Sequence, residues 1–151
     1  MSSQPDVVLS STCFKERNLL GLCELLTLHN INKIELSGNI QHLPLPQIKE
    51  ILNKYKGQIK FYIHNYFPAP STPIVLNLAH PDTVEKTIEH CEKAIDLCAF
   101  LDSAFYSLHA GLSFSPKPSD LGKDQTHLTS MSLDDSWKVL EKACIKVLEY
   151  A

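Results

Sequence analysis

The sequence predicts an α/β fold in which four strand–helix pairs follow one another along a single domain of 151 residues. Short runs rich in β-branched and aromatic residues alternate with longer runs that carry apolar residues at helical spacing. The repeat length is about 25 to 40 residues, which is usual where parallel strands are joined by right-handed helical crossovers. Hydrophobic residues make up 44% of the chain and charged residues 21%, as in an ordinary globular domain.

Two strand–helix pairs are predicted before residue 56. Residues 7–11 (VVLSS) form a short β-branched run that predicts the first strand, and the apolar residues 18–30 predict the first helix. A second strand is predicted at residues 33–38 (KIELSG), ending in a glycine turn. The second helix is predicted at residues 45–55 (LPQIKEILNKY), where the residues at helical spacing are Ile48, Ile51, Leu52 and Tyr55.

The third pair contains a long connection. Residues 60–67 (KFYIHNYF) predict a strand, and the prolines of residues 68–81 exclude a central strand there. Residues 82–101 are the clearest helix, with Asp82 as the expected N-cap and Glu85 as its capping-box partner. Its apolar stripe comprises Val84, Ile88, Cys91, Ile95 and Cys98.

The fourth pair is predicted from residues 104–111 (AFYSLHAG) as a strand and residues 132–151 as a helix. Between them, residues 112–131 are rich in Pro, Ser and Gly and predict a loop. Ser132 and Asp135 are expected to cap the last helix. The residues expected to face inward from it are Trp137, Leu140, Cys144 and Val147.

Composition and motifs exclude several classes of protein. The net charge is −3 and the Lys and Arg residues are scattered, which disfavours nucleic-acid binding. No apolar run approaches the roughly 18 residues of a membrane span, and the N-terminus lacks the pattern of a signal peptide. Neither a glycine-rich nucleotide motif nor a serine-hydrolase or zinc-protease motif is present.

The five cysteines form no CxxC pair, which disfavours a zinc ribbon. Cys23, Cys91 and Cys98 fall in predicted helices, while Cys13 and Cys144 complete the set. Their odd number and wide spacing predict free thiols in a reducing cytoplasm.

Polar side chains gather on one face of the predicted strands. In the third strand, His64 lies on the face opposite Phe61 and Ile63, because successive side chains alternate. His109 in the fourth strand and Glu35 in the second lie on the corresponding faces, near the carboxyl ends. A single histidine at a strand end is more often structural, but two histidines and a carboxylate on one face favour a functional site.

A βα barrel explains this pattern. A sheet covered by helices on both sides would be apolar on both faces. In a barrel the apolar face meets the helices, and the polar side chains point into the mouth at the carboxyl ends, where active sites lie. We therefore expect the His64 and His109 side chains to converge to roughly 4 to 6 Å, the separation of two imidazoles that could bind one metal ion through bonds of about 2 Å, as in zinc sites.

Four stretches resemble a known family. They are residues 34–39 (IELSGN), 61–70 (FYIHNYFPAP), 73–82 (PIVLNLAHPD) and 105–111 (FYSLHAG). In this order they resemble the N-terminal part of xylose-isomerase-like TIM-barrel proteins, the sugar phosphate isomerase/epimerase group that includes endonuclease-IV-type enzymes. The chain ends at Ala151, where a fifth strand would begin, so the resemblance implies a (βα)4 half barrel.

The resemblance also implies a site. His64 and His109 would lie in the barrel mouth, as zinc ligands in endonuclease-IV-like members or as substrate contacts in isomerase-like members. Glu35 would lie near the mouth, and Tyr66 and Asn77 would line it. The complete enzyme would hold a divalent ion such as Zn²⁺, Mn²⁺ or Mg²⁺, whose principal ligands come from strands five to eight.

The leading hypothesis is the N-terminal part of a metal-dependent sugar or sugar-phosphate isomerase or epimerase, acting on a sugar substrate. One alternative is an endonuclease-IV-like phosphoesterase, which predicts basic loops, whereas the loops here are poor in Lys and Arg. The other is a non-catalytic half barrel that assembles with a partner. We expect self-association or packing on the missing C-terminal half, weak metal binding and no turnover by this chain alone.

Overall fold

The computed structural model describes residues 7–151. It confirms an α/β fold with a four-stranded parallel sheet, in the order β1-β2-β3-β4, and four α-helices. The chain divides into two compact units. The first comprises Met1–Ala69 and Leu97–Ser107, and the second comprises Pro70–Asp96 and Leu108–Ala151.

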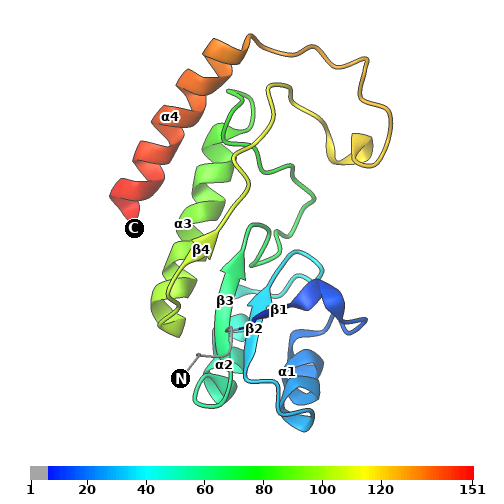
Figure 1. The fold of residues 1–151 in the computed structure, drawn as a ribbon, viewed down its shortest axis with the longest axis vertical. Coiled ribbons are helices and arrows are strands. Elements are labelled where there is room, and N and C mark those ends of the chain that lie inside the picture. The colour runs from blue at the N-terminus through cyan, green and yellow to red at the C-terminus, as the bar shows by residue number, and fades with distance from the viewer. Residues whose placement is uncertain (1–6) are drawn as a thin grey trace, which may run out of the picture. The chain divides into compact units, whose positions relative to one another are not determined.

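The parallel sheet belongs to the first unit (Figure 1). Its strands are β1 (Leu9–Ser10), β2 (Lys33–Leu36), β3 (Lys60–His64) and β4 (Tyr106–Ser107). The register places Glu35 beside Tyr62 and His64 beside Ser107. Neighbouring strands are consecutive in the sequence. Because every pair is parallel, all the carboxyl ends lie at one edge of the sheet.

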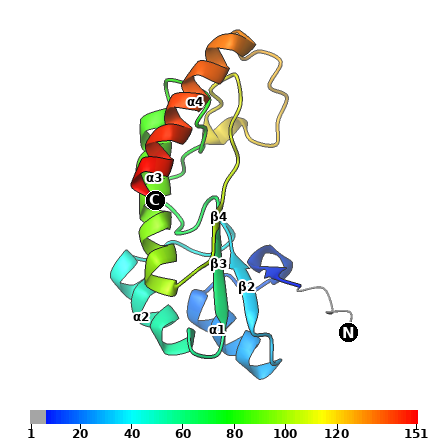
Figure 2. The same cartoon turned by 60° about the vertical axis from the view of Figure 1, so that its left-hand side comes forward.

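Two helices of the first unit lie beside β2 and β3 (Figure 2). α1 (Leu19–Leu28) begins after Asn18, whose side chain accepts a hydrogen bond from the Gly21 amide. α2 (Leu45–Tyr55) has a proline in its first turn, where the missing N–H costs no hydrogen bond. A short 3₁₀ helix, η1 (Ser11–Cys13), follows β1. Both predicted helices are confirmed.

The core of the first unit is built from one face of the sheet and from the two helices. β2 alternates between half-buried and buried residues, as the sequence pattern predicted. Burying each large aliphatic or aromatic side chain contributes about 1.5–3 kcal/mol. The fully buried members include Ile34, Leu36, Phe61 and Ile63 from the strands and Leu22, Leu26, Ile48 and Leu52 from the helices.

The fourth strand is shorter than the predicted span of residues 104–111. It ends at Ser107, so His109 lies beyond it and is exposed. After the strand, the Ala110 carbonyl accepts a hydrogen bond from the Leu78 amide at 3.1 Å. Gly111 then adopts a positive φ of 131°.

The second unit contains two helices that run side by side in the same direction (Figures 1 and 2). α3 (Val84–Leu101) begins in this unit and ends in the first, and α4 (Leu133–Tyr150) lies wholly in the second. Lys146 pairs with Glu85 at 3.0 Å, and the Tyr150 hydroxyl donates to Asp96 at 3.0 Å. The loop before α4 contains a 3₁₀ helix, η2 (Pro118–Asp120).

The start of α3 differs from the prediction by one residue. The helix begins at Val84, so Thr83 rather than Asp82 precedes it. The Thr83 hydroxyl donates back to the Asn77 and His80 carbonyls. The chain therefore approaches the helix in a turn that Asp82 does not cap. At α4 the predicted cap is confirmed, because Ser132 accepts from the Asp135 amide at 3.1 Å.

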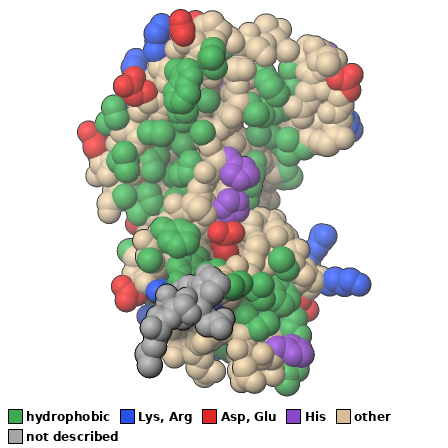
Figure 3. Space-filling view, viewed as in Figure 1, with side chains coloured by type: hydrophobic (Ala, Val, Ile, Leu, Met, Phe, Trp, Pro, Cys, Tyr) green, Lys and Arg blue, Asp and Glu red, His purple; other side chains and the backbone are tan. Residues whose placement is uncertain are grey.

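Trp137 does not face inward as predicted. Its side chain is 59% exposed, and Val147, which was expected to face inward, is buried. The buried line of α4 runs through the small residues Ser136 and Ala143, which allow the helix to approach its neighbours closely. The Ser136 hydroxyl also donates to the Ala79 carbonyl at 2.8 Å. Figure 3 shows the resulting hydrophobic side chains on the outer surface of α4.

Candidate functional site

Three polar side chains form a hydrogen-bonded chain on one face of the sheet in the first unit. The Ser107 hydroxyl lies 2.8 Å from His64 Nδ1 and 3.4 Å from Glu35 Oε2. The three residues come from β4, β3 and β2. We call this the Glu35–Ser107–His64 chain. His64 and Ser107 end their strands, so the chain lies toward the carboxyl edge of the sheet.

One arrangement of protons satisfies all three side chains. The Ser107 hydroxyl donates a hydrogen bond to Glu35, because a carboxylate accepts. The serine oxygen can then accept a hydrogen bond from His64 Nδ1. In this arrangement the imidazole proton lies on Nδ1, and Glu35 favours that tautomer through Ser107.

Ser107 is a site residue that the sequence reasoning did not select. The alternation of faces placed it beside His109 on the polar side of the fourth strand, but serine carries little signal by itself. The register of β3 and β4 supplies the missing information, because it brings Ser107 opposite His64.

Tyr66 follows β3 and packs tightly on Gly38. A Cβ added at Gly38 would lie 2.6 Å from the Tyr66 Cβ, so a side chain there forces the backbone or the tyrosine to move. Between β3 and Tyr66, Asn65 has a positive φ of 28° and its amide donates to the Ser107 carbonyl at 2.7 Å. The absence of a side chain at Gly38 therefore allows Tyr66 to pack against this backbone.

Asn77 and His109 lie in the second unit. Asn77 is fully buried, and its amide is used entirely by backbone groups. Its Oδ1 accepts from the Ala79 and Leu112 amides, and its Nδ2 donates to the Leu112 and Phe114 carbonyls, all at 2.9–3.0 Å. The Asn77 side chain thus stabilises the loop after β4, and both its donor hydrogens and both its acceptor lone pairs are used by backbone groups.

His64 and His109 belong to different units, so their expected convergence to within a few ångströms stays a prediction. Within the first unit, the structure brings Glu35 and His64 together through Ser107. His109 is exposed, and Tyr66 is half-buried.

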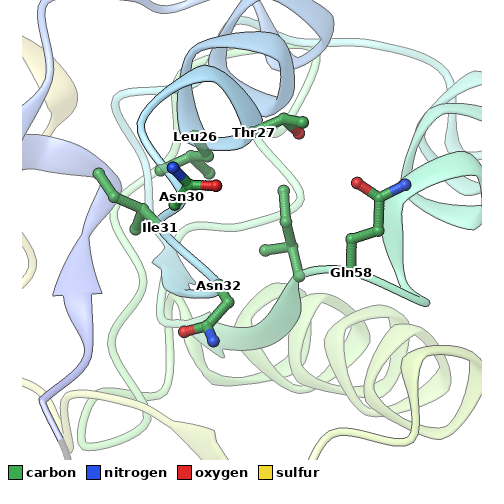
Figure 4. A pocket seen from close by; sticks show the side chains of 7 residues that line it. Leu26, Thr27, Asn30, Ile31, Asn32 and Gln58 are labelled. Carbon is green, nitrogen blue, oxygen red and sulfur yellow. The ribbon is translucent and has the colours of Figure 1, made fainter.

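A hollow of about 240 Å³ in the first unit lies away from the Glu35–Ser107–His64 chain (Figure 4). It is lined by the C-terminal turn of α1, by the residues that enter β2 and by those that enter β3, including Leu26, Asn30 and Gln58. These positions are at the amino ends of the strands, opposite the edge at which parallel α/β proteins bind ligands. We therefore do not assign a function to this hollow.

The residues present do not by themselves fit a divalent metal ion. Within residues 7–151, no group of three or more His, Cys, Asp or Glu side chains is placed to hold one. Glu35 and His64 would supply two donors of the three or four that a zinc site takes from the protein.

The cysteines are free thiols, as predicted. Cys23, Cys91 and Cys98 are buried in α1 and α3, whereas Cys13 is exposed. Burial, helped by the nearby Glu24 carboxylate, raises the pKa of Cys23 from 9.0 to about 12. A thiol in this state is neither a nucleophile nor a metal ligand at neutral pH.

The chain was compared with protein-family models, curated proteins and solved structures, and none of the three comparisons gave a match.

Among the described residues, none of the helices combines the length and the apolar character needed to cross a membrane.

Proposed function

We propose that this chain forms part of a metal-dependent sugar or sugar-phosphate isomerase or epimerase that acts in the cytoplasm. One observation carries the proposal: the Glu35–Ser107–His64 chain joins three neighbouring parallel strands toward their carboxyl ends. Active sites of parallel α/β enzymes lie at this edge. The consecutive strand order supports the half-barrel arrangement, because a doubly wound sheet reverses its order at a switch point.

The donors and acceptors suit a polyhydroxylated substrate. His64 Nε2 would accept the proton of a substrate hydroxyl, and the imidazolium so formed would be stabilised through Ser107 by Glu35. Sugar isomerases transfer hydrogen between neighbouring carbons and epimerases remove and return a proton at one carbon, and both need a group that accepts and returns a proton. Tyr66 and His109 are proposed as further contacts to the substrate.

A divalent ion, when bound, would polarise a carbonyl or hydroxyl of the sugar. Because the described residues do not complete a metal shell, the roles above are assigned to side chains of this chain alone. The endonuclease-IV-like activity has no separate observation in its favour and serves as an outcome of the test.

Sugar binding tests the proposal more directly than turnover does. Calorimetric titration should be run with aldoses, ketoses and their phosphates, and with a short abasic DNA duplex, each with and without Mn²⁺. We expect a sugar to bind, His64→Ala to weaken it at least about tenfold, and Ser107→Ala to weaken it about three- to tenfold.

His42→Ala is the matched control, because His42 is exposed and its Nδ1 lies 2.8 Å from the Ala69 carbonyl oxygen rather than beside Ser107. It should bind sugars like the wild type. Binding of the DNA but of no sugar, or sugar affinities that are the same in the wild type and in His64→Ala, would contradict the proposal.

A further inference from the structure

An aromatic pair lies on the same face of the sheet as the Glu35–Ser107–His64 chain. The rings of Tyr62 and Phe105 are stacked, with centroids 4.8 Å apart and planes inclined by 23°. Tyr62 is the register partner of Glu35, and Phe105 comes two residues before Ser107. The pair therefore borders the polar chain on its amino side.

The two rings differ sharply in exposure. Tyr62 is only 5% exposed, whereas Phe105 is 49% exposed although one of its faces covers Tyr62. About half of the phenylalanine surface is thus open to solvent while the ring is stacked on Tyr62. A single exposed apolar residue needs no explanation. Here, however, the exposed ring is fixed in orientation by a buried one.

The backbone of Phe105 is held by two hydrogen bonds from the end of α3 and the turn after it. Its carbonyl accepts from the Ser103 hydroxyl at 3.3 Å and from Cys98 Sγ at 3.7 Å. Tyr62 carries the Lys60 ammonium 5.5 Å from its ring centroid. A ring held in this way loses little conformational entropy when a ligand stacks on it.

We propose that Phe105 is the stacking platform for a cyclic sugar, whose ring lies on the phenyl face while its hydroxyls reach the Glu35–Ser107–His64 chain. This inference rests on the proposed function and specifies it: the substrate enters as a closed pyranose or furanose ring rather than as an extended polyol.

The distances and the chemistry agree with a sugar ring. Two residues along a strand span about 7 Å, the distance over which a ring on Phe105 must reach Ser107 and His64. One face of a sugar ring presents C–H groups polarised by the neighbouring oxygens, and the π face of an aromatic ring is negative. The rim of the sugar presents hydroxyls, which match a carboxylate, a serine and an imidazole.

The test compares a ring with the open chain that has the same hydroxyl-bearing skeleton. Affinities for D-glucose and for its alditol, D-glucitol, are measured by calorimetry on the full chain. We expect the wild type to bind the ring about tenfold more tightly. Phe105→Leu, which keeps an apolar side chain but removes the flat face, should reduce this ratio to about one. Phe105→Tyr should keep it.

Phe100→Leu is the matched control, because Phe100 lies under Lys49 and Lys56, away from the polar chain. Circular dichroism must show that each variant is folded, and Phe105→Trp supplies a second ring-bearing variant. An unchanged ratio in Phe105→Leu, or equal affinities in the wild type, would overturn the platform and leave the proposed function intact. Absence of binding by every sugar in the panel would overturn both.

Discussion

Asn77→Ala should destabilise the second unit strongly. The substitution removes four side-chain hydrogen bonds from a fully buried position. Two backbone amides, those of Ala79 and Leu112, lose their acceptor, and the Leu112 and Phe114 carbonyls lose their donor. The groups of Leu112, which is 40% exposed, can turn to water. The Ala79 amide, in a residue only 6% exposed, cannot do so easily.

These contacts set the expected magnitude. An orphaned buried donor costs about 1–3 kcal/mol, and each bond exchanged for water costs up to about 1 kcal/mol. The combined range is about 1–6 kcal/mol, and its middle, about 3–4 kcal/mol, is a large part of the total stability of an ordinary domain. For a chain of this size a loss of about 3–4 kcal/mol lowers Tm by roughly 6–16 °C.

Urea unfolding followed by circular dichroism at several wavelengths measures this loss. Asn53→Ala is the control, because Asn53 lies exposed on α2 and alanine favours the helix there. It should be neutral or slightly stabilising. A change of less than about 1 kcal/mol in Asn77→Ala would refute the structural role and return Asn77 to the group of substrate contacts.

Three further predictions follow from other parts of the first unit. Gly38→Ala should cost about 1–3 kcal/mol, because the new Cβ would meet the Tyr66 Cβ at 2.6 Å. Gly57→Ala, with nothing within 4 Å of its Cβ, should be neutral or stabilising by up to about 1 kcal/mol. Comparable urea midpoints for the two variants would contradict the steric argument. In the native protein a maleimide should label exposed Cys13 and spare buried Cys23. Burial raises the pKa of Cys23 to about 12, so between pH 9.0 and 12 the folded state keeps a proton that the unfolded state loses; the contribution of the buried thiol to stability is complete below pH 9.0 and is lost as the pH rises toward 12. Rapid labelling of Cys23 in the native protein at pH 8 would be inconsistent with this burial. The short strands β1 and β4 are the two edges of the sheet, and sheet edges are sites at which chains associate, so light scattering at tens of micromolar should detect self-association. A monodisperse monomer with a cooperative melt would count against it.

The helices and the parallel sheet could be predicted because their signals are local. α2 spans the same residues as its predicted run, since Ile48 and Leu52 mark one face and a proline marks the first turn. The alternation of β2 between half-buried and buried residues was likewise visible in the sequence. Such patterns depend on the periodicity of each element alone.

The remaining differences depend on tertiary contacts. The inward face expected for α4 included Trp137 and Val147, but the buried residues are Ser136, Ala143 and Val147. Trp137 is exposed, because the buried line passes through the small residue beside it in the sequence. β4 likewise ends at Ser107, before His109, and the Ala110 carbonyl bonds instead to the Leu78 amide, which is far away in the sequence.

In the candidate site, too, some residues could be selected from local sequence signals, and others only from tertiary contacts. Glu35 and His64 could be selected because charged or imidazole side chains near strand ends are unusual. Ser107 became visible only through its register with His64, and Asn77 changed from a substrate contact to a structural residue once its backbone partners were known. The relation of His64 to His109 joins the two units and stays a prediction.

The ¹⁵N NMR spectrum of the histidine rings shows whether Ser107 and Glu35 set the protonated nitrogen of His64. With His64 assigned by comparison with His64→Ala, the account predicts the Nδ1–H tautomer at neutral pH, because Ser107 links Nδ1 to Glu35. It also predicts that a bound sugar shifts the Nε2 resonance, and that Ser107→Ala weakens the tautomer preference while Ser103→Ala leaves it unchanged. An Nε2–H tautomer in the wild type, or an Nε2 resonance that no sugar moves, would contradict the account.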